Sequence, residues 1–134
     1  MELGLKGKVA MVAASSKGLG YGVARELARE GALVSIGART ESEVFEAAEI
    51  LTQETGADGL ANVLDASVPD SIAQWIDNTV ADFGGVDKLV VNAGGPPAGK
   101  FDDFADSDWQ HAFDLTLMSA VRMIRGVLPF MREV

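Results

Sequence analysis

The feature that most constrains this sequence is the regular alternation of short apolar runs with stretches of helical periodicity. Four apolar runs are bounded by glycine or polar turn residues, and they span residues 9–14, 33–36, 59–64 and 88–92. Runs of this kind are typical of parallel strands, because both faces of a parallel sheet are covered. Apolar residues recur at helical spacing between and after these runs, over residues 19–28, 44–51, 72–83 and 109–128.

Strands that alternate with helices of crossover length predict a parallel sheet with helices on both faces. Right-handed crossovers favour the strand order 3-2-1-4. We therefore expect an α/β fold of the Rossmann type, a doubly wound parallel sheet. No repeat, linker or low-complexity segment interrupts the pattern, so residues 1–134 are expected to form one domain.

Local signals set the expected helix ends and core faces. Thr40–Glu43 and Ser107–Gln110 resemble capping boxes, and Gly56 and Gly84 are expected to end two helices. Both tryptophans, Trp75 and Trp109, are expected in the core. The apolar face of the first helix is predicted to contain Leu19, Val23, Ala24, Leu27 and Ala28, and that of the last helix Trp109, Phe113, Leu117, Ala120, Val121, Ile124 and Leu128.

Composition excludes several classes of function. The net charge of −9 argues against nucleic acid or an anionic membrane as a partner, since both are bound with an excess of Lys and Arg. No cysteine and a single histidine argue against disulfides and a zinc site, so no metal ligand is predicted. No run of about 18 apolar residues and no signal peptide are present, so we expect a soluble, cytoplasmic protein.

The turn after the first apolar run is the most informative motif. A backbone with glycines can approach a pyrophosphate closely, and a helix that begins there offers unpaired N–H groups and its positive dipole end. Glycines also serve purely steric needs in such turns, and the spacing is neither G-x-G-x-x-G nor a phosphate loop. Its position after the first strand favours a cofactor-binding turn, comprising Ala14, Ser15, Ser16, Lys17, Gly18, Leu19 and Gly20.

The end of the second apolar run bears on which nucleotide is bound. NAD-preferring sites usually hold an acidic residue there for the adenosine ribose, and this chain has Ala38. Arg39 and Lys17 offer two cations where a 2′-phosphate would lie, which favours NADP(H) over NAD(H). The alternative is that Arg39 is simply a solvated loop residue.

The third and fourth apolar runs also end in polar or small residues. Asp65 and Ala66 follow the third, and Asn92, Ala93 and Gly94 follow the fourth. The carboxyl edge of an open α/β sheet is where ligands bind, so all five are candidate cofactor contacts. Asp65 could equally cap the next helix, Asn92 could tie adjacent loops together, and Gly94 could only make a turn.

Other candidates are weaker. No nucleophile accompanies His111, so an exposed or capping role is favoured over catalysis. Four acidic residues crowd the loop and the start of the last helix, namely Asp102, Asp103, Asp106 and Asp108. Paired carboxylates could serve acid/base work or hold a divalent cation, but a favourable interaction with the helix dipole is the favoured interpretation. The segment 94–99 could close over a substrate or only connect two elements.

Taken together, these residues resemble the short-chain dehydrogenase/reductase family, in particular its classical branch with 3-oxoacyl-carrier-protein-reductase-like members. The resemblance extends from Lys6 to Met131. It implies that the glycine turn holds the pyrophosphate and that Asp65 contacts the adenine. It also implies that Asn92-Ala93-Gly94 supports the central strand and borders the nicotinamide ribose.

The sequence departs from the family pattern at three points. Ala14 stands where the family has the first glycine of the turn, and Thr116 stands where it has an Asn that bends the helix and holds a water. The family's catalytic Ser and Tyr-x-x-x-Lys are missing, and Tyr21 with Arg25 is no substitute for them. We therefore assign no catalytic residue, and expect this chain to end before the catalytic strand and helix.

The resemblance implies a part of an NADP(H)-dependent oxidoreductase, which transfers hydride between nicotinamide and a small carbonyl or alcohol substrate. The alternative is a non-catalytic nucleotide-binding module or inactive fragment. A third alternative is an S-adenosylmethionine methyltransferase, which shares the strand order. It is disfavoured because such sites need an acidic residue at the end of the second strand, where this chain has Ala38. If the chain ends at Val134, its fourth strand has an unpaired edge, so we expect a homo-oligomer.

Overall fold

The computed structural model describes residues 2–133. Four strands alternate with helices as the sequence predicts, and the last predicted helical stretch is divided into two α-helices by a π-helical segment, with a 3-10 helix before them. The elements are β1 (Val9–Ala13), α1 (Gly18–Arg29), β2 (Leu33–Ala38), α2 (Glu41–Thr55), β3 (Gly59–Val63), α3 (Pro69–Phe83), β4 (Lys88–Val90), the 3-10 helix η1 (Phe101–Asp103), α4 (Asp106–Phe113), the π-helical η2 (Asp114–Met118) and α5 (Ser119–Met131).

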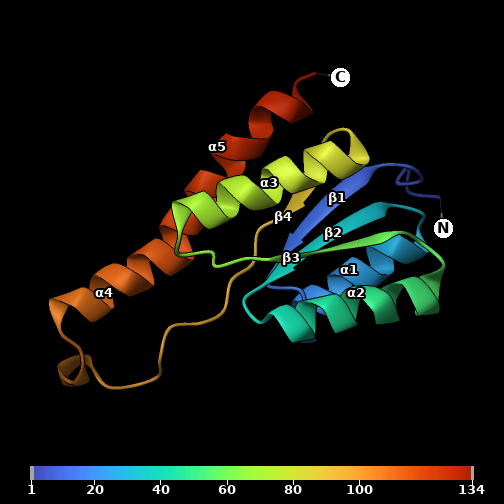
Figure 1. Ribbon diagram of the computed structural model, residues 1–134. Helices are drawn as coiled ribbons and strands as arrows, with labels where there is room; N and C mark the ends of the chain where they lie inside the picture. The colour runs from blue at the N-terminus through green and yellow to red at the C-terminus, as the bar shows by residue number, and fades with distance from the viewer. Residues whose placement is uncertain (1, 134) are drawn as a thin grey trace.

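The sheet has the order β3-β2-β1-β4, and every neighbouring pair is parallel. Helices α1 and α2 cover one face, and α3 and α5 cover the other (Figure 1). The predicted strand order and the doubly wound Rossmann-type arrangement are therefore confirmed. The order places β1 in the interior, where Val12 pairs with Ile36 on one side and Val90 on the other.

Strand β1 separates two hydrophobic cores. All five of its residues are buried, and successive side chains point to opposite faces. Ala10 and Val12 join the core beneath α1 and α2, whereas Met11 and Ala13 join the core beneath α3 and α5. A strand with no solvent-facing side needs a continuous apolar run, which is why the sequence pattern identified it.

Helix α1 packs on the sheet mainly through small residues, and Tyr21 and Leu27 are partly buried against the same core. Ala24 and Ala28 are buried, as predicted, and Gly20 is buried with them. Leu19 and Val23 are 89% and 40% exposed, so their predicted place in the core is wrong. The fully buried positions of α1 are occupied by small residues, which allows the helix to approach the sheet closely.

Helices α2 and α3 follow their predictions more closely. The predicted apolar positions of α2 are buried, and both helices end at glycines with left-handed backbone, Gly56 and Gly84. The predicted capping box at the start of α2 is wrong, because the side chain of Thr40 makes no capping hydrogen bond. Glu43 is therefore not held to the helix start by that motif.

A buried polar cluster joins α3 to β2 and β3. The Ser35 hydroxyl lies 2.7 Å from the Thr79 hydroxyl and accepts hydrogen bonds from the Trp75 indole at 3.0 Å and the Asn62 amide at 3.3 Å. Ser35, Thr79 and Trp75 are almost completely buried. Because a buried polar group costs free energy unless it is paired, this cluster fixes one position of α3 on the sheet.

The last helical stretch differs most from prediction. Its buried face is formed by Leu115, Ser119, Met123 and Val127, and the predicted face contains residues that are about half exposed, namely Trp109, Phe113, Leu117 and Ile124. Two causes combine. The π-helical turn η2 shifts the helical phase, and the predicted face of α4 packs on aromatic residues of the preceding loop at Trp109 and not on the sheet.

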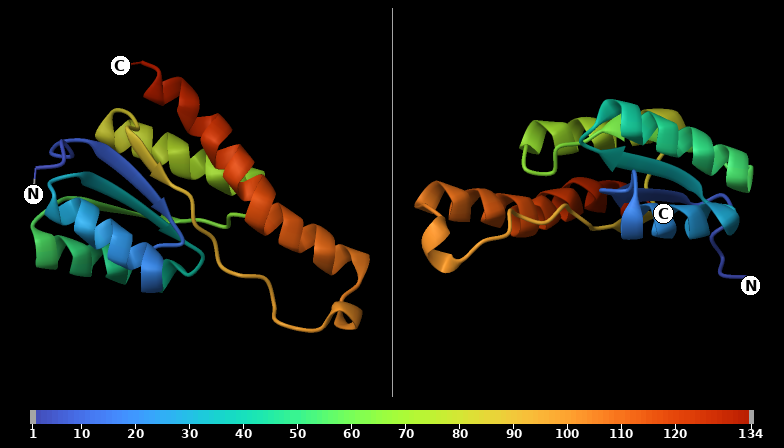
Figure 2. Two further views of the ribbon diagram at one scale, coloured as in Figure 1. Left: turned by 180° about the vertical axis from the view of Figure 1, so that it is seen from behind. Right: turned by 90° about the horizontal axis from the view of Figure 1, so that it is seen from below.

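The start of α4 also differs from prediction. The helix begins at Asp106 instead of after Ser107, and the Asp108 carboxylate accepts a hydrogen bond of 2.9 Å from the Ala105 amide. Trp109 is half exposed and packs against Phe101 and Phe104, with ring centroids 5.6 and 6.4 Å apart. Views from behind and from below show α4 and the preceding loop extending beyond the sheet (Figure 2). Among the helices within residues 2–133, none is long and apolar enough to cross a membrane.

Candidate functional site

A groove of about 550 Å³ lies along the carboxyl edge of the sheet. It is built from the segments that follow β1, β2, β3 and β4, including the first turns of α1 and α2, together with one side chain from η2. The lining residues are Ala14, Ser16, Lys17, Leu19, Gly20, Ala38, Arg39, Thr40, Glu43, Leu64, Ala66, Asn92, Ala93, Gly94, Gly95 and Leu115. The sheet topology thus brings ten of the thirteen predicted site residues into one cavity.

The β1–α1 turn forms the floor of the groove. Ala14 has a φ of +49°, a left-handed conformation in which side chains are strained. A Cβ at Gly20 would overlap the Ala14 carbonyl oxygen, so only glycine allows α1 to start this close to β1. Lys17 is the N-cap of α1 and makes no side-chain cap, which leaves the N–H groups of the first turn available to an anion.

Two residues of the predicted turn lie outside the groove lining. Ser15 is completely buried, and its hydroxyl donates to the Val12 carbonyl at 2.7 Å and accepts from the Gly37 amide at 3.3 Å. It holds the turn to β2. Gly18 has a φ of +63° and lines a separate surface groove between α1 and the N-terminal segment.

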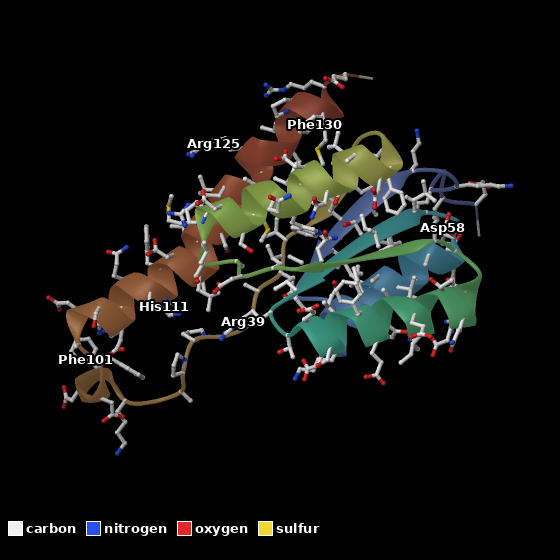
Figure 3. All side chains as sticks on the ribbon, viewed as in Figure 1. Arg39, Asp58, Phe101, His111, Arg125 and Phe130 are labelled. Carbon is white, nitrogen blue, oxygen red and sulfur yellow. The ribbon has the colours of Figure 1, made fainter. Side chains whose placement is uncertain are left out.

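Two cations border the groove. Lys17 and Arg39 both line it and both are exposed. Arg39 projects from the carboxyl edge of the sheet, on the side toward which α4 extends (Figure 3). At the end of β2, Ala38 is buried and carries no polar side chain. Two cations and one carboxylate, that of Glu43, therefore line the groove, and the end of β2 itself carries no acidic side chain.

Asp65 turns toward the start of α3. Its carboxylate accepts hydrogen bonds from the Ser67 amide at 3.0 Å and the Ser67 hydroxyl at 2.6 Å. The hydroxyl hydrogen bond is the main reason that the pKa of Asp65 lies below its ordinary value, with smaller help from Arg39. Asp65 is absent from the groove lining, and the neighbouring Ala66 takes part in it.

The segment after β4 forms the opposite wall. The Asn92 side-chain amide donates a hydrogen bond of 3.3 Å to the Ala14 carbonyl, which ties the end of β4 to the β1–α1 turn. Ala93 and Gly94 continue the wall. The loop-tying role considered for Asn92 is therefore present, and the residue lines the groove as well.

Sequence reasoning missed six lining residues. Thr40 and Glu43 were interpreted as a capping box, and Leu115 lies outside the apolar face predicted for its helix. Ala38, Leu64 and Gly95 adjoin predicted residues, and their place at strand ends could have suggested them. No signal in the sequence distinguishes Leu115 from any other apolar helix residue.

The remaining polar candidates lie apart from the groove. Tyr21 donates a hydrogen bond of 3.2 Å to Glu54, and burial together with Glu54 raises the pKa of the Tyr21 phenol. His111 is exposed and lines a second, smaller cavity of about 280 Å³ with Pro96 and Pro97. Thr116 lies in the π-helical turn, and its hydroxyl donates to the Ala112 carbonyl at 2.7 Å. Across residues 2–133, no three acidic or histidine side chains gather to hold a metal ion.

The sequence profile of the short chain dehydrogenase family matches residues 8–134. The chain belongs to this family. It is similar to dehydrogenase/reductase SDR family member 4 of Caenorhabditis elegans, with 36% identity over 127 residues that cover 92% of this chain and 48% of the relative.

Solved structures of family members superpose closely. L-sorbose reductase of Gluconobacter frateurii, in complex with NADPH and L-sorbose, has a TM-score of 0.95 and 36% identity over 99% of this chain and 51% of that protein. The NADH-dependent reductase A1-R′, in complex with NAD, has a TM-score of 0.90 and 28% identity over 99% of this chain and 55% of that protein. The chain thus spans about half the length of these proteins.

Proposed function

We propose that this chain is the cofactor-binding part of a short-chain oxidoreductase that uses NADP(H) and acts on a small carbonyl or alcohol. The observation that carries the proposal is the groove at the carboxyl edge, where Lys17 and Arg39 lie beside a strand end without an acid. Both the NADPH-bound sorbose reductase and the NAD-bound reductase support a nicotinamide dinucleotide as the ligand.

The residues present fit such a cofactor. The uncapped start of α1 supplies N–H donors for a pyrophosphate, and Gly20 lines the groove in the first turn of that helix. Lys17 and Arg39 would pair with a 2′-phosphate, and Asn92 to Gly94 would border the nicotinamide ribose. Bound nicotinamide supplies hydride exchange with a carbonyl carbon.

The role of this chain's own residues is binding and orientation. Tyr21 is the single tyrosine of the sequence, and its raised pKa and its contact with Glu54 make it unsuited to protonate a substrate in the groove. We therefore expect the 134-residue chain to bind the cofactor without reducing a carbonyl. Turnover by this chain alone would contradict that expectation.

Calorimetric titration tests the cofactor assignment. We expect NADPH to bind more tightly than NADH. Arg39→Ala should weaken NADPH binding about tenfold, because a charge-assisted pair to the phosphate is lost, and should change NADH binding by less than about threefold.

Arg29→Ala is the matched control. Arg29 is exposed on α1, pairs with Glu26 at 2.8 Å and lies outside the groove lining, so its removal should leave both affinities unchanged. Binding of neither nucleotide to the wild-type chain would refute the cofactor assignment. Equal losses for NADPH and NADH in Arg39→Ala would refute the role of Arg39 in selecting NADP(H).

A further inference from the structure

An acidic side chain lines the groove that holds the two cations. Glu43, in the first turn of α2, lies in the lining with Arg39 and Lys17. The family resemblance assigns no role to this residue. Its presence matters because the proposed preference for NADP(H) rests on positive charge at this end of the groove, and the inference below rests on that proposed function.

The structure leaves the Glu43 carboxylate available. In a capping box it would accept a hydrogen bond from the Thr40 amide, but no capping box forms at this helix start. Among residues 2–133, the ion pairs are Arg25 with Glu26, Arg29 with Glu26, and Arg122 with Asp114, so none of them engages Glu43. The side chain is exposed and faces the groove without a competing cation bound to it.

We propose that Glu43 is a specificity-determining residue that restrains the preference of the groove for NADP(H) over NAD(H). The end of β2 has no acidic side chain, because Ala38 stands there, and Glu43 in the first turn of α2 supplies one instead. A carboxylate there accepts hydrogen bonds from the free ribose hydroxyls of NAD(H), and it repels the 2′-phosphate of NADP(H).

The charges in the lining set the direction of the effect. Lys17 and Arg39 contribute two positive charges, and the negative charge of Glu43 offsets one of them in the net charge of the lining. A phosphate monoester carries about −1.5 to −2 charges at neutral pH, whereas a ribose hydroxyl is neutral. The field of Glu43 therefore acts mainly on the cofactor that carries the extra phosphate. Exposure screens this field, which limits its effect to about threefold to tenfold in affinity.

Glu43→Gln in the 134-residue chain tests the inference, since it removes the charge and keeps the shape of the side chain. We expect the NADPH dissociation constant to fall about threefold or more, and the NADH dissociation constant to stay the same or rise. Raising the salt concentration should shrink the difference between the variant and the wild type, because the effect is electrostatic.

Glu49→Gln is the matched control. Glu49 is exposed on the same helix and lies outside the groove lining, so it carries the same change in net charge without the local contact. Equal behaviour of Glu43→Gln and Glu49→Gln would overturn the inference, as would an equal gain for NADPH and NADH. If the wild-type chain binds neither nucleotide, the proposed function fails first and the inference fails with it.

Discussion

At the scale of single residues, Ala14 stands out by its left-handed backbone conformation. It is the single non-glycine residue within residues 2–133 that has a positive φ. Two neighbours hold it in place, since the Asn92 amide binds its carbonyl oxygen and Gly20 packs against that oxygen. The surrounding structure therefore maintains the strained conformation, because contacts from Asn92 after β4 and from Gly20 in α1 fix the direction of the Ala14 carbonyl.

Replacing Ala14 by glycine should stabilise the protein. An L-residue in the left-handed region is destabilised by about 1–2 kcal/mol, and glycine removes this cost. Glycine also loses more conformational freedom on folding, which offsets about 0.5–1 kcal/mol of the stabilisation. We expect a net gain of about 0.5 kcal/mol in the free energy of unfolding, measured by urea denaturation.

Ala13→Gly is the control for Ala14→Gly. Ala13 is buried in β1 and lies outside the left-handed region, so the same change there should destabilise the protein. Loss of stability in Ala14→Gly of the same size as in Ala13→Gly would show that Ala14 carries no strain.

The candidate site was predictable where the type of a residue and its position after a strand both indicate a ligand contact. The β1–α1 turn, Arg39 and Asn92 follow buried strands, and the ends of parallel strands meet at one edge. Glu43 was not predictable, because its spacing from Thr40 also fits a capping box that the structure does not form. Asp65 was predicted as a cofactor contact or a helix cap, and only the structure shows that Ser67 engages its carboxylate.

At the scale of elements, strands covered on both faces were the most predictable. Both faces of a strand such as β1 are buried, so an apolar run is enough to identify it. A helix buries only one of its faces, and the neighbouring layers determine which face that is. In α1 the small residues face the sheet, and in the last helix a π-helical turn moves the buried face to Leu115 and Ser119. Neither effect is encoded in apolar periodicity.

The polar cluster between α3 and the sheet should be sensitive to substitution. Ser35→Ala leaves the buried Trp75 indole, Thr79 hydroxyl and Asn62 amide without their shared partner. We expect a loss of about 2 kcal/mol in the free energy of unfolding, measured by urea denaturation. Ser42→Ala, at an exposed position of α2, should change stability by less than about 0.5 kcal/mol. Equal effects of the two changes would mean that the cluster does not position α3.

The exposed apolar face of α4 and η2 should drive self-association. Trp109, Phe113 and Leu117 are each about half exposed, and monomeric proteins rarely expose a continuous patch of this kind. We expect sedimentation velocity to detect species larger than a monomer, and Leu117→Lys to shift them toward the monomer. Gln53→Lys, exposed on α2, adds the same charge and should not. A wild-type chain that stays monomeric at high concentration would contradict this expectation.

At the scale of the whole molecule, the strand order creates the site. After β3 the chain crosses back over the sheet through α3, on the opposite face from α2, and β4 is added beside β1, parallel to it. The turns after β1 and β4 then meet across the groove, joined by the bond from Asn92 to Ala14. This arrangement follows from the alternation of strands and helices and from right-handed crossovers, which is why it was predictable from the sequence.

The most direct test of the central claim is to map NADPH binding by amide chemical shifts. We predict that NADPH shifts the amide resonances of the groove, those of Gly20, Arg39 and Gly94 in particular. Residues at the opposite edge of the sheet, such as Asp58 and Gly84, should stay unchanged. An NADPH titration that leaves the groove resonances in place, or shifts only resonances far from the carboxyl edge, would contradict the account.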